Sequence, residues 1–173
     1  MGDAEQSRLR MEQLVSLDPK RFLNAFSEPW LNELIPRVDR MMGCGQGAVQ
    51  HLEGDVAVHT ALVFENLLQI TPLRVQREAD FVERLSVLLH DLRKPDVRQA
   101  QSDGAVSFPG HEALAAAEVP SIAARIGLNA QEAARLQFLV ARHGDAHSWS
   151  KLTPAVRDEL RSSPYAVSLA LLQ

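Results

Sequence analysis

Apolar residues recur at helical spacing along most of this chain, and that pattern predicts a protein built from α-helices. From Glu78 to Leu92 the apolar positions follow the i, i+3, i+4, i+7 order of one buried helix face. From Asp55 to about Ile70 a second apolar run fits another buried helix. No series of alternating apolar and polar residues is convincing as a set of strands. We therefore expect an all-α fold, a single-domain helical bundle.

Prolines, glycines and capping residues mark where these helices begin and end. Asp18-Pro19 and Thr153-Pro154 have the form of a cap followed by proline at the first helical position. Asn129, with Glu132 three residues later, predicts the start of a helix that ends near Gly144. The other expected features are a helix begun by Ser27-Glu28-Pro29 and continued to Val38, a glycine-broken loop at 43–47, a helix stop at Pro95, a loop or small hairpin at 96–109, a helix from Gly110 that Pro120 kinks or ends, Gly127 just past its end, and a last apolar run from Ala166 to Leu172.

The length and composition suit a compact globular protein. A chain of 173 residues fits one domain with a short addition, so we expect an N-terminal helical extension over residues 1–28 and one domain over 29–173. Hydrophobic residues make up 46% and charged residues 23%, which is typical of globular proteins. The 18 basic and 22 acidic residues give a net charge of −4, which disfavours long DNA as a partner but leaves room for a local basic pocket.

Other classes of protein are disfavoured by what the sequence lacks. The single cysteine, Cys44, excludes an intrachain disulfide framework and a thiolate metal cluster, and with no evident base beside it a nucleophilic role is not expected. No apolar run approaches the roughly 20 residues that span a bilayer, and residues 1–6 lack the pattern of a secretory signal. We therefore expect a cytoplasmic protein with no membrane partner.

The sharpest chemical signal is the dipeptide His90-Asp91 at the end of a strongly apolar helix. An imidazole and a carboxylate at a buried helix end are costly unless they are paired or bind a metal. Side chains at consecutive positions of a helix terminus can converge on one point just beyond it. A hydrogen-bonded pair at a helix end remains the alternative interpretation.

Three further histidines extend this signal. His59, His111 and His143 each lie at or within a predicted helix, and the helices of so small a domain must pack against one another. The alternative is three unrelated histidines, each satisfied in the core or at the surface.

With these residues in place, the sequence resembles the HD superfamily of metal-dependent phosphohydrolases. It is most similar to the HD domain of bacterial tRNA nucleotidyltransferases and related RNA-end repair proteins. The resemblance covers roughly residues 31–147, and the ordered set of motifs is more specific than any single piece. The matching stretches are Glu53-Gly54-Asp55-Val56 through His59-Thr60, Leu88 to Pro95, Asp103-Gly104 through Glu112, and Arg125-Ile126-Gly127-Leu128 through His143.

The resemblance implies a role for each matched residue. His59, His90 and Asp91 would bind one divalent metal, and Asp91 would bridge to a second metal held by His111 and His143. His143 would contact the substrate instead if only one metal binds. Lys94, one helical turn beyond Asp91, would face the site and hold a substrate phosphate oxygen, as a compact ammonium suits charge that develops at phosphorus.

The implied cofactors are one or two divalent metal ions. Imidazole and carboxylate ligands without thiolate suit Mn, Co, Ni, Zn or Fe, and the sequence does not choose among them. A metal lowers the pKa of bound water and polarises a phosphoryl oxygen. The predicted reaction is therefore hydrolysis of a phosphoester by metal-activated water, without a covalent enzyme intermediate, with Asp91 and Lys94 as catalytic residues.

Two departures from the family pattern bear on this prediction. The family has a further ligand aspartate on a later helix, which would fall just past Gln173, and Asp145 and Asp158 are the substitutes within the chain. The last apolar run also stops at Gln173 without a cap, so we expect the natural chain to continue. Arg93 stands where the family usually has glycine, either as a second phosphate contact or as a solvated residue at a helix end.

The remaining candidates have plainer interpretations. Glu112 could support a ligand histidine or simply interact with a helix N-terminus as an exposed carboxylate. His51 and His147 lie outside the ligand pattern and are expected in loops. Met41-Met42, with Trp30, is expected to supply core rather than a binding surface.

The leading functional hypothesis is a phosphoesterase acting on nucleotides or on an RNA terminus, with a 2′,3′-cyclic phosphodiesterase or 2′-phosphatase of RNA repair as its most specific form. A kinase or other RNA-processing module could follow in a longer chain. The alternatives are a nucleotidase or phosphatase acting on free nucleotides, a non-catalytic regulatory module with an incomplete metal site, and an iron-dependent oxygenase.

Overall fold

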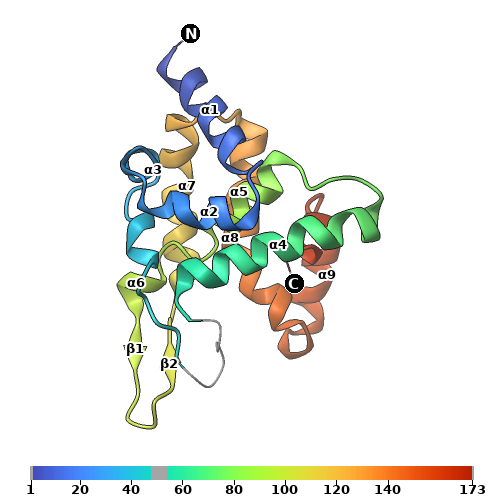
Figure 1. The fold of residues 1–173 in the computed structure, drawn as a ribbon. Coiled ribbons are helices and arrows are strands. Elements are labelled where there is room, and N and C mark those ends of the chain that lie inside the picture. Colours follow the sequence, from blue (N-terminus) through green and yellow to red (C-terminus); the bar gives the residue numbers. More distant parts are fainter. Residues whose placement is uncertain (1, 48–53, 173) are drawn as a thin grey trace.

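The computed structural model describes residues 2–47 and 54–172 and shows an all-α helical bundle, as the apolar spacing predicts. The only strands in these ranges form a small hairpin that projects from one end of the bundle (Figure 1). It pairs Gln99–Ala100 with Val106–Ser107 and fulfils the expectation of a loop or hairpin between residues 96 and 109.

The elements follow one another along the chain with short connections. In order they are α1 (Asp3–Leu14), α2 (Pro19–Asn24), the 3₁₀ turn η1 (Ala25–Ser27), α3 (Pro29–Leu34), η2 (Val38–Met41), α4 (Val56–Val75), α5 (Phe81–Leu89), α6 (Lys94–Val97), β1 (Gln99–Ala100), β2 (Val106–Ser107), α7 (His111–Arg125), α8 (Ala130–His147), η3 (Trp149–Lys151), α9 (Pro154–Ser162) and α10 (Ala166–Ala170).

Side-chain caps set several of these boundaries. Asp18 accepts from the backbone N–H groups of Lys20 and Arg21 at the start of α2, as expected. The Asn129–Glu132 capping box at the start of α8 is confirmed. A second capping box, between Asp80 and Glu83, begins α5 at Phe81 rather than at Glu78 as predicted. This correction moves Glu83 into the first turn of a buried helix.

Two predicted helices differ from those in the structure, and one further expectation is narrowed. The Glu78–Leu92 helix ends at Leu89, and Pro95 occupies the first turn of the separate helix α6 instead of acting as a stop. The helix expected over 29–38 divides into α3 and η2. Of the two outcomes expected at Pro120, a kink or a helix end, the structure excludes the end, because α7 continues to Arg125. The carbonyl that Pro120 leaves without a helical donor, at Ala116, accepts from the side chain of Gln137 on α8.

The core extends through all parts of the bundle. The ring of Phe22 on α2 stacks on the ring of Phe64 on α4, with the two ring centroids 4.2 Å apart. Met11 of α1 is fully buried. Residues 2–28 therefore share the core of the later helices, and their division from 29–173 stays a prediction. Met41 is buried as expected, whereas Met42 is exposed.

Helix α4 corrects the expectation about apolar length. By length and composition it could cross a membrane, contrary to the expectation that no apolar run is long enough. Of its apolar window, 39% is buried inside the bundle, where it packs on α2 and α5. A core helix passes the same test, so this feature is weak evidence for a membrane span.

Candidate metal centre

Four histidines and one aspartate from four parts of the chain meet at one place. His59 lies on α4, His111 begins α7, and His143 lies on α8. His90 and Asp91 form the turn directly after α5, where the capping box at the other end fixes the start of the helix. The groups that could hold a metal ion are His59 with His90 and Asp91, and Asp91 with His111 and His143.

Asp91 lies at the centre, with one carboxylate oxygen facing each pair of imidazoles. Its Oδ2 lies 3.1 Å from Nε2 of His90 and 3.6 Å from Nε2 of His59. Its Oδ1 lies 3.1 Å from Nε2 of His111 and 3.7 Å from Nε2 of His143. The side chain of Asp91 is 1% exposed. This arrangement gives a carboxylate that could bridge two cations, each with two imidazole ligands.

The backbone fixes which nitrogen of each ring faces Asp91. Nδ1 of His90, His111 and His143 lies 2.7 Å from the carbonyl three residues earlier in each case. A carbonyl only accepts, so each Nδ1 carries the proton and donates it. In the neutral rings Nε2 then presents a lone pair toward Asp91. Ligand histidines in metal sites are commonly held in this way.

Electrostatics within the cluster favour an ionised aspartate. Burial would raise the pKa of Asp91, but the surrounding imidazoles outweigh it and hold that pKa well below the ordinary value. Burial lowers the pKa of His143. Burial also acts to lower the pKa of His111, yet its contact with Asp91 leaves that pKa raised overall. The site thus holds an ionised carboxylate between two imidazoles, His111 and His143, whose pKa values move in opposite directions.

The imidazole nitrogens and carboxylate oxygens of the cluster are better placed to bind a cation than to hydrogen-bond to one another. Among residues 2–47 and 54–172, neither oxygen of Asp91 has a hydrogen-bond partner of good geometry, although Nζ of Lys94 forms an ion pair with Oδ2 at 2.8 Å. Nε2 of His111 lies 3.3 Å from Nε2 of His143, so one proton could join that pair but would leave other lone pairs facing oxygens. Protonating every ring would crowd like charges in a buried space. Divalent cations satisfy lone pairs and carboxylate oxygens together.

Lys94 lies beside the cluster, at the start of α6. Its Nζ is 2.8 Å from Oδ2 of Asp91 and donates to Oε1 of Gln46 at 2.6 Å. The ammonium also lies over the ring of Phe108. Gln46 is buried and was missed by the sequence analysis, because nothing local connects it to a residue 48 positions later.

Arg93 lies outside the residues that line the site cavity. Its guanidinium pairs with Asp96 and with Glu118 of α7, and its side chain is 14% exposed. The interpretation of Arg93 as a solvated residue is therefore wrong. Its role as a phosphate contact stays a prediction.

A cavity of about 330 Å³ opens onto the cluster. Besides the predicted ligands and Lys94, its lining includes Glu112, Gly144, His147 and Ser148. His147 is the last residue of α8, one turn beyond His143, so its predicted place in a loop is wrong. Burial lowers the pKa of His147.

Glu112 takes a position that depends on Gly144. One carboxylate oxygen of Glu112 lies 3.2 Å from Nδ1 of His111. The other would lie 2.9 Å from a Cβ at Gly144, so this glycine leaves room for the carboxylate. Glu112 therefore contacts a predicted ligand histidine, as one of its two interpretations had it.

The remaining sequence candidates lie elsewhere. Asp145 pairs with Arg142 at 2.9 Å, and Asp158 is exposed and pairs with Arg161, so neither joins a metal-holding group in the part of the chain that the structure describes. His51 and Glu53 fall outside the described residues. Cys44 is buried, and burial raises the pKa of its thiol, which suits the expectation that it is no nucleophile.

Comparison with known proteins relates the chain to one group. No protein-family model matches it. It is 30% identical over 127 residues to a multifunctional CCA protein of Polaromonas naphthalenivorans, which covers 72% of this chain and 27% of that protein. The corresponding protein of Ralstonia nicotianae is 33% identical over 119 residues (68% and 25%), and that of Verminephrobacter eiseniae is 28% identical over 125 residues (72% and 28%). The chain is thus a distant relative of a segment that makes up about a quarter of multifunctional CCA proteins.

Proposed function

We propose that this chain is a metal-dependent phosphohydrolase that acts on phosphoesters of nucleotides or RNA ends. The observation that carries the proposal is the bridging geometry of Asp91. Each of its buried oxygens faces two imidazole nitrogens, and three of these rings already donate their other nitrogen to the backbone. The proposed ligand set is His59, His90, Asp91, His111 and His143.

The chemistry divides between the bound ions and the chain. When bound, divalent metals supply water of lowered pKa and polarise a phosphoryl oxygen. Lys94 offers a fixed positive charge next to Asp91, where it can hold an equatorial phosphate oxygen. The cavity of about 330 Å³ lies in the range of small-ligand pockets, so it suits a terminal nucleotide.

The preference for RNA ends rests on the family resemblance and on the relatives. The resemblance is closest to the HD domain of bacterial tRNA nucleotidyltransferases, and the similar proteins are multifunctional CCA proteins. Hydrolysis of 2′,3′-cyclic phosphates or 2′-phosphates is therefore the most specific form of the proposal. A cytoplasmic setting belongs to the same proposal.

Elemental analysis with a substrate panel tests this function. The panel contains an oligonucleotide ending in a 2′,3′-cyclic phosphate, one ending in a 2′-phosphate, and free 5′-nucleotides. We expect two metal ions per chain, turnover of the RNA ends, and loss of both in Asp91→Asn. Best turnover of free 5′-nucleotides would replace the RNA substrate with the nucleotidase alternative.

A non-catalytic role is the other outcome to separate. It draws on one observation, that Asp91 is the only carboxylate in the metal-holding groups found among the described residues. A protein that binds no metal, turns over no phosphoester, and behaves identically with Asp91→Asn would overturn the proposed function.

A further inference from the structure

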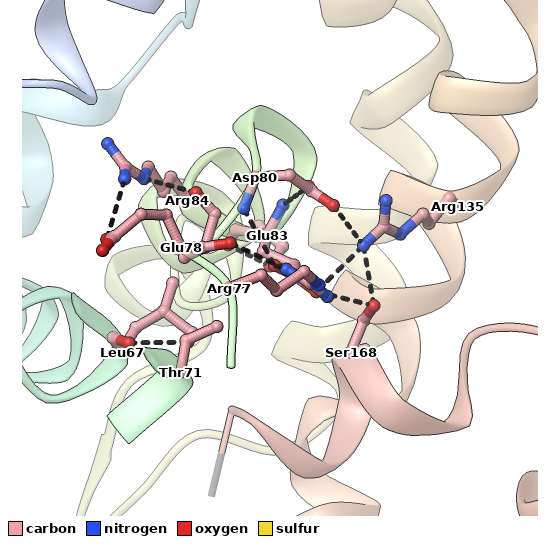
Figure 2. A network of polar contacts seen from close by, with 11 residues as sticks. Leu67, Thr71, Arg77, Glu78, Asp80, Glu83, Arg84, Arg135 and Ser168 are labelled. Carbon is pink, nitrogen blue, oxygen red and sulfur yellow. Dashed lines mark hydrogen bonds and ion pairs between the residues drawn. The ribbon is translucent and has the colours of Figure 1, made fainter. Parts of the chain in front are cut away.

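A second charge cluster surrounds a buried carboxylate on α5 and α8, two of the elements that position the metal centre. Glu83, in the first turn of α5, is fully buried. Arg77, from the loop before α5, holds both of its oxygens at 2.6 and 2.7 Å. Arg135 of α8 contacts Glu83 at 3.0 Å, and Figure 2 shows these groups converging.

Arg135 connects more elements than Arg77 does. Its Nη2 lies 2.8 Å from Asp80, the cap of α5, and donates to Oγ of Ser168 on α10 at 2.7 Å. Ser168 in turn donates to Glu83 at 2.9 Å. Burial would raise the pKa of Glu83, but Arg77, the Asp80 backbone and Ser168 hold it below the ordinary value. The carboxylate is therefore charged and fully satisfied.

The two clusters lie at different positions along the same pair of neighbouring helices, α5 and α8. The rings of His90 and His143 are 5.0 Å apart at the site, whereas Glu83 and Arg135 meet further back along the same helices. Both contacts advance in chain order, so α5 and α8 run in the same direction. The separations of seven and eight residues correspond to roughly 10.5 and 12 Å of helix. A contact at one level thereby fixes the register at the other.

We propose that Arg135 is a positioning residue that sets the distance between Asp91 and His143 by fixing α8 against α5. This inference rests on the metal centre of the proposed function. Only one of the two groups depends on α8, namely Asp91 with His111 and His143. The group of His59, His90 and Asp91 belongs to α4 and the turn directly after α5. Loss of Arg135 should therefore weaken one metal position and spare the other.

The chain supplies a matched control in Arg77. Both arginines pair with Glu83, but Arg77 comes from the loop before α5, and its hydrogen bonds among the described residues are with Glu83 and the Glu78 carbonyl. In Arg135→Met, Arg77 and Ser168 still satisfy Glu83. In Arg77→Met, Arg135 and Ser168 do so. Each variant thus keeps the buried carboxylate paired while removing one connection.

Titration of the metal-free full chain with Mn²⁺, followed by calorimetry, tests the inference. We expect two ions in the wild type, a loss of roughly 10-fold or more in the weaker affinity for Arg135→Met, and both affinities unchanged in Arg77→Met. The Tm of each metal-free variant reports stability separately. Arg135→Lys, which keeps the charge without the planar fork, should recover part of the affinity.

Three results would overturn the inference. In the first, Arg135→Met binds both ions as tightly as the wild type does. In the second, Arg135→Met and Arg77→Met both lose affinity for both ions, and by the same factor. If Arg135→Met does not fold, Arg135→Lys takes its place, and wild-type binding by that variant would likewise overturn it. A wild type that binds no metal would overturn the proposed function itself, which distinguishes the two failures.

Discussion

Glu83 and Asp91 are buried carboxylates eight residues apart, and their surroundings differ in one decisive respect. Glu83 faces two guanidinium groups, a backbone N–H and a hydroxyl, all of which donate. Asp91 faces four imidazole nitrogens, three of whose rings already donate their other nitrogen to the backbone, with an ammonium beside it. The first carboxylate is compensated by the protein alone, whereas the second is arranged for added positive charge.

The largest expected effect separates the two carboxylates by stability. Glu83→Gln should lower the free energy of unfolding of the metal-free protein by about 3 kcal/mol, the lower end for a broken buried pair. Solvent weakens the pairing, because the side chains of Arg77 and Arg135 remain 41% and 21% exposed. Urea denaturation measures it. Glu78→Gln in the same cluster, 73% exposed, should change stability by less than about 0.5 kcal/mol.

A slightly smaller effect is expected for stabilisation by metal, which should depend on Asp91 and not on Glu83. Mn²⁺ at 100 times its dissociation constant should stabilise the wild type by about 2.7 kcal/mol, because the ion binds the folded state only. Asp91→Asn should lose this stabilisation, and Glu83→Gln should keep it. Thermal unfolding with and without a chelator measures the difference. Equal metal-dependent shifts of Tm in the wild type and in Asp91→Asn would show that Asp91 does not differ from Glu83 in this respect.

Acid sharpens the comparison further. The pKa of Glu83 in the folded state is lower than its ordinary 4.5, so the folded protein binds fewer protons there than the unfolded chain. The contribution of Glu83 to the free energy of unfolding is therefore fully present above pH 4.5, and it is lost as the pH falls through the folded-state pKa of Glu83. Glu83→Gln should flatten this part of the stability curve. An unchanged acid slope would show that Glu83 is not held ionised.

The smallest expected effect concerns Gly144. Alanine there favours the helix by up to about 1 kcal/mol, but its Cβ displaces the Glu112 carboxylate from His111. Gly144→Ala should therefore be as stable as the wild type or slightly more so, and bind the second Mn²⁺ a few-fold more weakly. Glu112→Gln separates the two effects, because its amide keeps the shape of the Glu112 side chain without the charge. Unaltered binding in both variants would remove Glu112 from the site.

Local patterns in the sequence predicted the helices and several caps, because spacing and capping act over three or four residues. The grouping of His59, His90, Asp91, His111 and His143 came from the family resemblance, and the structure brings these residues together. Long-range pairs were not predictable in this way. Gln46 and Lys94 meet across 48 positions, and Glu83 and Arg135 across 52.

Two positions expected at or near helix ends lie inside helices for a shared reason. Pro120 was expected to kink or end its helix and Gly144 to lie near the end of its own, but each is accommodated by a neighbouring helix. Glu112 fills the space that Gly144 leaves, and Gln137 supplies the donor that Pro120 removes. Tertiary contacts thus override local preference, and His147 enters the site because α8 continues past Gly144.

The shared carboxylate of Asp91 also has a consequence for how the proposed centre fills. Because one anion serves both positions, the first ion to arrive neutralises part of the attraction available to the next. Loading would then be anticooperative, with two well-separated steps, and cellular metal supply would determine whether the half-filled or the complete form predominates.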